Sequence, residues 1–114
     1  MKYQLASYSL AGGRATNQDR IVCAERDNAV LLVLADGLGG HTGGALAAEI
    51  LTQTAQHAFE AVRQPVITKP SAFLALTIMQ AHKAIYAHGQ VRTPPISPRT
   101  TCVLCLVQNG YAYW

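Results

Sequence analysis

Two acidic residues border apolar stretches of the chain at positions where they are free to bind a ligand. Asp19 ends the polar run Arg14-Ala15-Thr16-Asn17-Gln18-Asp19, and Asp36 follows the apolar run Leu31–Ala35, directly before Gly37. Mg²⁺ and Mn²⁺ prefer carboxylate, carbonyl and water oxygens as ligands. A glycine lets the backbone approach a ligand because it has no side chain. The two acids therefore predict a site for divalent cations, with the Gly37 carbonyl as a further ligand.

Arg14 adds a positive charge to the same polar run. Its planar guanidinium is suited to two phosphate oxygens at once, and a pair of metal ions can polarise a water into a hydroxide in line with a phosphoryl group. Two nucleotide-binding motifs are missing: the chain has no P-loop pattern, and Thr42 stands where the dinucleotide fingerprint needs its third glycine. Metal-assisted attack on a phosphate is the chemistry that this pattern favours.

A β-hairpin is expected to bring the two acids together. Residues 20–26 and 29–35 read as strands, and Asp27-Asn28 between them is a tight turn. Residues just outside each strand of a hairpin lie at its open end, so we expect Asp19 and Asp36 to be neighbours.

The other elements complete an α+β pattern. Periodicity and turn residues predict two helices that pack as an antiparallel pair, one over about 43–62 and one that begins after Ser71 and stops at Gly89. Thr42 or Gly43 is positioned to cap the first helix. Strands are expected over residues 2–10, 100–107 and 111–114, the last two joined by an Asn109-Gly110 turn.

Length and composition exclude several classes of protein. With 114 residues, half of them hydrophobic, the chain is one domain or part of one. Its net charge of +3 comes from scattered Lys and Arg residues, which argues against a nucleic-acid partner. The chain has neither a secretory signal nor an apolar run of membrane-spanning length. We expect a cytoplasmic protein that does not interact with membranes.

The three cysteines do not form a disulfide framework, since their number is odd. Cys102-x-x-Cys105 has the spacing of a metal or redox pair, but it lies in an expected strand, where positions three apart face opposite sides. Core thiols are the favoured interpretation, and a zinc or redox pair the alternative.

Three blocks of sequence, in this order and spacing, resemble a known family. They are Arg14-x-x-Asn17-Gln18-Asp19, then Asp36-Gly37-Leu38-Gly39-Gly40-His41, then Thr100-Thr101 opening a strand that leads to Asn109-Gly110-Tyr111-Ala112-Tyr113-Trp114. The chain resembles the front half of a PPM-type (type 2C) metal-dependent serine/threonine protein phosphatase. The resemblance implies a β-sandwich flanked by antiparallel helix pairs, in αββα layers, of which residues 1–114 form a single, partial domain.

The resemblance also implies roles for individual residues. Arg14 would bind the substrate phosphate, Asp36 would bridge two Mn²⁺ or Mg²⁺ ions, the Gly37 carbonyl would complete the shell of one ion, and Asp19 would hold metal-bound water. Catalysis would then be the hydrolysis of phosphoserine or phosphothreonine in a protein that a serine/threonine kinase had phosphorylated. The complete enzyme is expected to be a monomer.

Several positions differ from the pattern of the family or indicate one form of it. Gln18 stands where many members carry glutamate, and Leu38 where some eukaryotic members carry histidine; with His41, these residues resemble the bacterial form of the motif. A later Gly-Asp-Ser-Arg segment and two further aspartates of the family do not occur, so we expect a truncated domain.

Two alternatives to an active phosphatase therefore stay open. One is a catalytically silent fragment, or a metal- or phosphate-binding module of the same fold. The other is a purely structural α+β interaction protein, which treats both loops as coincidence.

Overall fold

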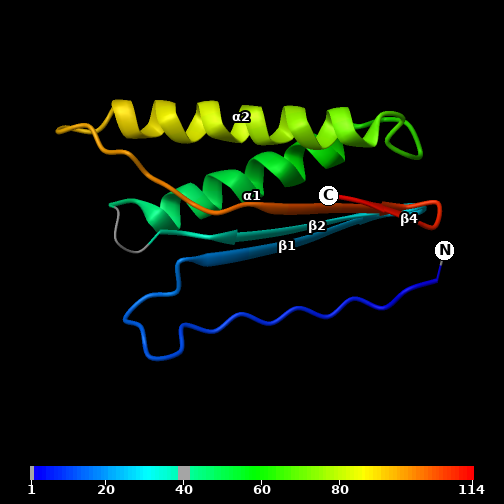
Figure 1. The fold of residues 1–114 in the computed structure, drawn as a ribbon, viewed down its shortest axis with the longest axis horizontal. Coiled ribbons are helices and arrows are strands. Elements are labelled where there is room, and N and C mark those ends of the chain that lie inside the picture. Colours follow the sequence, from blue (N-terminus) through cyan, green and yellow to red (C-terminus); the bar gives the residue numbers. More distant parts are fainter. Residues whose placement is uncertain (1, 39–41) are drawn as a thin grey trace.

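The computed structural model describes residues 2–38 and 42–114, and shows an antiparallel sheet with two helices over one of its faces (Figure 1). The strands lie in chain order across the sheet. The elements are β1 (Asp19–Arg26), β2 (Ala29–Asp36), α1 (Gly44–Ala61), α2 (Pro70–Gln90), β3 (Val103–Gln108) and β4 (Tyr111–Tyr113). The predicted α+β class is confirmed, and the described chain contains one sheet and one helix layer of the expected sandwich.

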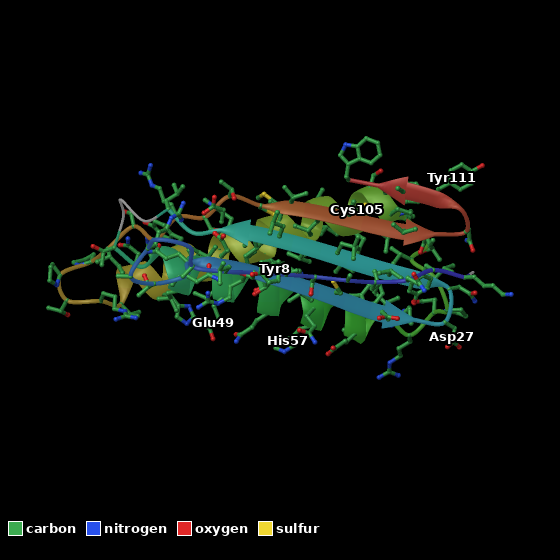
Figure 2. All side chains as sticks on the ribbon, turned by 90° about the horizontal axis from the view of Figure 1, so that it is seen from below. Tyr8, Asp27, Glu49, His57, Cys105 and Tyr111 are labelled. Carbon is green, nitrogen blue, oxygen red and sulfur yellow. The ribbon has the colours of Figure 1, made fainter. Side chains whose placement is uncertain are left out.

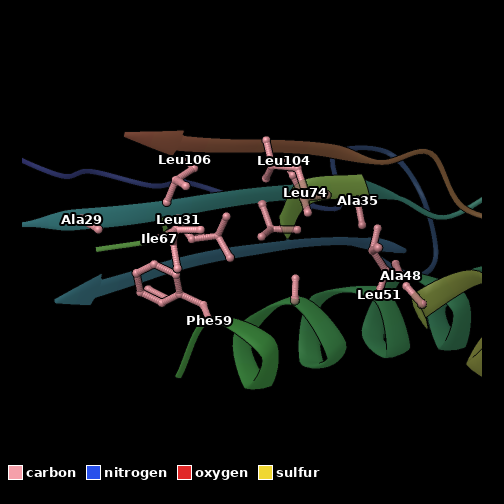
Figure 3. Close-up of a cluster of buried hydrophobic side chains, with 14 residues drawn as sticks. Ala29, Leu31, Ala35, Ala48, Leu51, Phe59, Ile67, Leu74, Leu104 and Leu106 are labelled. Atoms are coloured by element: carbon pink, nitrogen blue, oxygen red, sulfur yellow. The ribbon is translucent and has the colours of Figure 1, made fainter. Parts of the chain in front are cut away.

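The two faces of the sheet differ in what covers them. On β2, Leu31, Val33 and Ala35 are buried against the helices, whereas Leu34 and Asp36 point to the opposite face and are exposed. This alternation is the two-residue period of a strand. Figure 3 shows the side chains between sheet and helices, with Phe59 and Leu51 of α1 beneath the strands. The core therefore lies between the sheet and α1, and Asp36 belongs to the open face.

Arg26 at the end of β1 holds the C-terminal end of α1. Its guanidinium donates hydrogen bonds to the carbonyl oxygens of Phe59 (3.1 Å), Val62 (2.6 Å) and Gln64 (2.8 Å), and lies 4.8 Å from the centroid of the Phe59 ring. The last carbonyls of a helix have no partner within it, and a cation near them is also favoured by the helix dipole. This contact joins α1 to the far end of the hairpin from Asp36.

A buried glutamine joins the connector between the helices to β3. Gln108 donates to the carbonyl oxygen of Ile67 at 2.8 Å and accepts from the Ile67 N–H at 2.9 Å. All four polar groups are thus satisfied in pairs inside the core, where an unpaired amide would be costly. The pair fastens the connector that leads into α2 to the end of β3. The two helices run antiparallel, as predicted (Figure 1).

Most element boundaries lie within three residues of their prediction, but one strand is wrong. Residues 2–10 form no strand, and pair with no other strand among the described residues. An extended segment becomes a strand only when its N–H and C=O groups find a ladder partner, and β1 pairs on one side only. The segment instead crosses the open face of the sheet, with Tyr8 over the strands (Figure 2). Ala6, Ser7 and Tyr8 line a cavity there, together with residues of the strands.

The ends of the helices refine the predicted boundaries. Gly43 is the N-cap of α1, with φ of 88°, a conformation that glycine adopts without strain. Ser71 is not the cap of α2, because Lys69 takes that position and Pro70 opens the first turn. Gly89 does not stop α2, which continues to Gln90.

At the predicted hairpin turn, Asn109 and Gly110 both have positive φ (51° and 77°), as a type I′ turn requires.

The cysteines are free, and Cys102 and Cys105 do not form a metal pair. Cys105 faces the open side of the sheet, and Cys102 precedes β3 and packs against the helix-side core. Burial raises the pKa of the Cys102 thiol, so that it stays protonated. Among the described helices, none is both long and apolar enough to cross a membrane.

Candidate functional site

Asp19 and Asp36 are direct cross-strand neighbours. Asp19 is the first residue of β1 and pairs with Asp36, the last residue of β2, in the antiparallel register. Residues paired in this way have Cβ atoms about 4.5–5.5 Å apart and point to the same face of the sheet. The predicted proximity of the two acids is confirmed. Two like charges at this distance repel each other, so the arrangement favours a cation between them.

Thr101, in the segment just before β3, binds the backbone of Asp36. The Asp36 N–H donates to Thr101 Oγ1 at 3.0 Å, and the Thr101 N–H donates to the Asp36 carbonyl oxygen at 2.9 Å. The Thr101 hydroxyl also lies 3.3 Å from that carbonyl oxygen. The backbone that carries the Asp36 carboxylate is therefore held between β1 and the segment before β3.

Thr101→Val should lower the free energy of unfolding of the whole protein, meaning the polypeptide that contains residues 1–114, by about 1 kcal/mol. Valine keeps the shape of threonine but leaves the Asp36 N–H without its partner. Thr100→Val is the matched control, because the one hydrogen bond of Thr100 Oγ1 within the described chain goes to the carbonyl oxygen of the next residue. Urea unfolding of both variants measures the difference. Equal midpoints for the two variants would contradict a role for Thr101 in holding Asp36.

Two glycines let three backbone segments meet beside the acids. The Gly37 N–H donates to the Gln18 carbonyl oxygen at 3.1 Å. A Cβ added to Gly37 would lie 2.4 Å from the Gly44 carbonyl oxygen, and one added to Gly44 would lie 2.7 Å from the Leu38 carbonyl oxygen. Such distances are shorter than any tolerable contact. The polar loop, the end of β2 and the start of α1 can pack together only because both residues are glycine.

Arg14 shares a cavity with Asp36. A space of about 460 Å³ is lined by the loop before β1 and by the residues that end β2, namely Arg14, Ala15, Thr16, Gln18, Asp36, Gly37 and Leu38. Both Arg14 and Asp36 are exposed to solvent. The structure thus brings together a guanidinium, a carboxylate and the backbone of Gly37, as the sequence predicted.

The residues present fit a divalent cation, although they supply only part of a shell. Oδ1 of Asp19 and Oε1 of Gln18 are buried and have no hydrogen-bond partner among the described residues. A buried oxygen of this kind costs free energy unless something binds it, and oxygen is the ligand that Mg²⁺ and Mn²⁺ prefer. Within residues 2–38 and 42–114 there is no cluster of three acidic, histidine or cysteine side chains that could hold a metal ion.

The other sequence candidates are not at this site or cannot be placed. Gly39, Gly40 and His41 of the bend lie outside the described residues. His57, His82 and His88 are on the helices, with His88 Nδ1 3.0 Å from the Ala84 carbonyl oxygen of its own helix. None of these three histidines is among the described residues that line the cavity with Arg14 and Asp36, and His82 lines a second cavity beside α2.

Sequence reasoning missed the residues that hold the acids in place. Besides Thr101 and Gly44, Asn17 accepts a hydrogen bond from the Asp19 N–H at 3.0 Å, which is an Asx turn. Arg20 then donates to the carbonyl oxygens of Asn17 (2.9 Å) and Asp19 (2.8 Å). The Asn-x-Asp spacing was the available signal for this turn. The contact of Thr101 with Asp36 joins residues 65 positions apart. Gly44 is near Gly37 in the chain, but their close approach depends on how α1 leaves the end of β2, which no local pattern indicates.

The fold and the site define a class: an α+β domain that presents paired acids and an arginine at one end of a sheet backed by a helix pair. A profile of the protein phosphatase 2C family matches residues 9–114. The chain belongs to the protein phosphatase 2C family. No match was found among curated protein sequences.

Solved structures of bacterial phosphatases have a similar fold. One is a bacterial serine phosphatase with an arginine-to-alanine substitution, 29% identical, with a TM-score of 0.77 over 88% of this chain and 46% of that one. A form of a bacterial serine phosphatase with an arginine-to-glutamate substitution is 30% identical, with a TM-score of 0.73 over the same shares. The serine/threonine phosphatase of S. agalactiae, at 24% identity and a TM-score of 0.72, covers 92% of this chain and 43% of its own, and shows the likeness of fold alone. The chain spans less than half the length of these proteins.

Proposed function

We propose that the whole protein is a metal-dependent serine/threonine phosphatase that hydrolyses phosphoserine and phosphothreonine in phosphorylated proteins. The observation that carries this proposal is the cross-strand pair Asp19–Asp36, which shares the end of the sheet with Arg14. Membership of the family supports it. The pairing of Asp19 with Asp36 in the hairpin register, and the presence of Arg14 in the wall of the cavity beside Asp36, support it further.

The residues of this chain have distinct parts in the reaction. Asp36, the Gly37 carbonyl and Asp19 would hold Mn²⁺ or Mg²⁺, and two such ions would supply an activated water and neutralise charge on the phosphoryl group. Arg14 would bind two phosphate oxygens through its planar fork. Thr101 and Asn17 orient the backbone of the two acids. Gln18, with its buried Oε1, adds a neutral oxygen where a glutamate would add a charge.

Arg14→Ala tests the phosphate-binding role. We expect KM for p-nitrophenyl phosphate to rise about tenfold in Mn²⁺ buffer, because hydrogen bonds to a charged group contribute about 1.5–3 kcal/mol. Inhibition by inorganic phosphate should weaken by a similar factor. The KM of Arg14→Lys should lie between those of the parent protein and of Arg14→Ala, since lysine keeps the positive charge but lacks the planar fork of arginine.

Arg63→Ala is the control, because Arg63 is exposed just after the C-terminal end of α1. An Arg14→Ala protein with unchanged KM and unchanged phosphate inhibition would show that this guanidinium does not contact the substrate.

A second candidate is a catalytically silent module that binds metal or phosphate. The described residues unite two acids at the site, which is fewer than the ligands that a two-metal centre needs. Such a module would bind Mn²⁺ weakly and turn over no substrate. Metal-dependent hydrolysis of p-nitrophenyl phosphate by residues 1–114 alone would exclude it.

A further inference from the structure

A second cavity adjoins the candidate site on its helix side. It has a volume of about 490 Å³ and lies between the C-terminal half of α2 and residues 96–100. This size is within the usual range of ligand pockets in proteins. His82, Ile85 and Tyr86 line it from the helix, and Ile96 and Arg99 from the facing segment.

Leu38 connects this cavity to the site. It lines both the cavity that contains Arg14 and Asp36 and the cavity beside α2. Its N–H donates to the Arg99 carbonyl oxygen at 3.0 Å, which joins the residue after Gly37 to the far wall. A peptide whose phosphate binds beside Arg14 can therefore extend the side chains next to its phosphorylated residue toward the second cavity.

The walls of the cavity are held apart by backbone contacts at both ends. At the end of α2, the Ile96 N–H donates to the Gly89 carbonyl oxygen at 3.1 Å, and a Cβ on Gly89 would collide with the Ile96 carbonyl and with Pro98. At the other end, Arg99 is bonded to Leu38. These two anchors fix the ends of the segment that faces Ile85 across the cavity.

The chemistry of the walls selects one kind of occupant. Most of the lining is apolar, from Leu38, Ile85, Ile96 and the ring of Tyr86. Among the described residues that line the cavity, the ionisable side chains are Arg99, His82 and that tyrosine, and none is a carboxylate. An apolar lining with a cation suits an apolar side chain on a chain that carries negative charge. A phosphopeptide is such a chain.

We propose that this cavity is a specificity pocket, which binds an aliphatic or aromatic side chain of the substrate close to its phosphorylated residue. The inference rests on the proposed phosphatase function, since it takes the phosphopeptide as the ligand of the neighbouring site. Tyr86 and Ile96 are specificity-determining residues, and neither takes part in the chemical step.

The test compares phosphothreonine peptides in the whole protein. One series carries a single leucine at successive positions on either side of the phosphothreonine, in an otherwise alanine-rich sequence, and the reference peptide carries alanine throughout. We expect kcat/KM to be about tenfold higher for leucine at one or two adjacent positions, which is the size of effect that a side chain produces in an apolar pocket. A flat series, with no preferred position, would overturn the inference.

Tyr86→Asp is the diagnostic variant and Met79→Asp its matched control. Both residues are exposed on α2, at 62% and 54%, and are seven positions apart on a similar face of the helix, but Met79 does not line the cavity. Tyr86→Asp should remove the leucine preference, and Met79→Asp should keep it. If Tyr86→Asp kept the preference for leucine, the leucine side chain would bind outside this cavity and the inference would be wrong.

Hydrolysis of p-nitrophenyl phosphate separates this inference from the function on which it rests. This small substrate has no flanking side chain, so its turnover should be equal in the parent protein, in Tyr86→Asp and in Met79→Asp. Absence of turnover in the parent protein in Mn²⁺ buffer would defeat the phosphatase assignment itself. Turnover of p-nitrophenyl phosphate without any peptide preference would defeat the pocket alone.

Discussion

Asp36→Asn should reduce the turnover of p-nitrophenyl phosphate in Mn²⁺ buffer by about a hundredfold or more, the range seen when one preorganised group of an active site is removed. Asparagine has the shape of aspartate but lacks its charge. Because Asp36 pairs with Asp19 across the hairpin, the loss would leave one carboxylate at this end of the sheet. Affinity for Mn²⁺, measured by calorimetry, should fall together with turnover.

Asp27→Asn is the control for this variant. Asp27 is an exposed acid in the turn of the same hairpin, at the end opposite Asp36 (Figure 2). The Asp27→Asn substitution removes the same negative charge from the same hairpin, but at the end away from the site. Turnover of p-nitrophenyl phosphate should therefore remain at the parent level. Unchanged turnover in Asp36→Asn would contradict the assignment of Asp36 to the metal site.

Gly37→Ala should lower the stability of the whole protein by about 2–3 kcal/mol, the usual cost of forcing an extra methyl group into a packed site. The added Cβ would lie 2.4 Å from the Gly44 carbonyl oxygen and 2.8 Å from the Gln18 carbonyl oxygen. Both are main-chain atoms, which cannot rotate away as a flexible side chain would. The start of α1 or the polar loop must therefore move, and the carbonyl of residue 37 with it. We expect the midpoint of urea unfolding and the Mn²⁺ affinity both to decrease.

Gly13→Ala is the matched control for that prediction. A Cβ at Gly13 would meet nothing within 4 Å, and its backbone does not have the positive φ of Gly12. Gly13→Ala should change the unfolding midpoint little, or raise it slightly, because alanine restricts the unfolded chain. If Gly37→Ala were as stable as Gly13→Ala, the close backbone contact at Gly37 would not exist in solution.

The hairpin and the helices could be predicted because their signals are local. The alternation along residues 29–35, the Asp27-Asn28 turn and the helical spacing from Ala45 to Val62 each lie within a short stretch of chain. The register of β1 with β2 then follows from the turn. The proximity of Asp19 and Asp36 depends on this one hairpin, so it could be predicted from the sequence.

The strand expected over residues 2–10 was wrong for the opposite reason. Its alternation of aromatic and small residues is compatible with a strand, but a strand also needs a partner that no local pattern supplies. Among the described residues β1 has its neighbour on one side only. Tyr3 instead donates a 2.7 Å hydrogen bond to the Glu25 carboxylate across the open face of the sheet.

The amino-acid sequence by itself determined the acids, the arginine and the glycines of the site, and the hairpin that aligns Asp19 with Asp36. Only the tertiary structure decided what holds them: Thr101 on the Asp36 backbone, and Gly44 against Gly37. Only the tertiary structure also opened the cavity between α2 and residues 96–100. The Thr101–Asp36 contact and the cavity each join segments that are distant in the chain, and the approach of Gly44 to Gly37 depends on how α1 packs beside the end of β2. These contacts therefore form only when the elements pack together and exclude water.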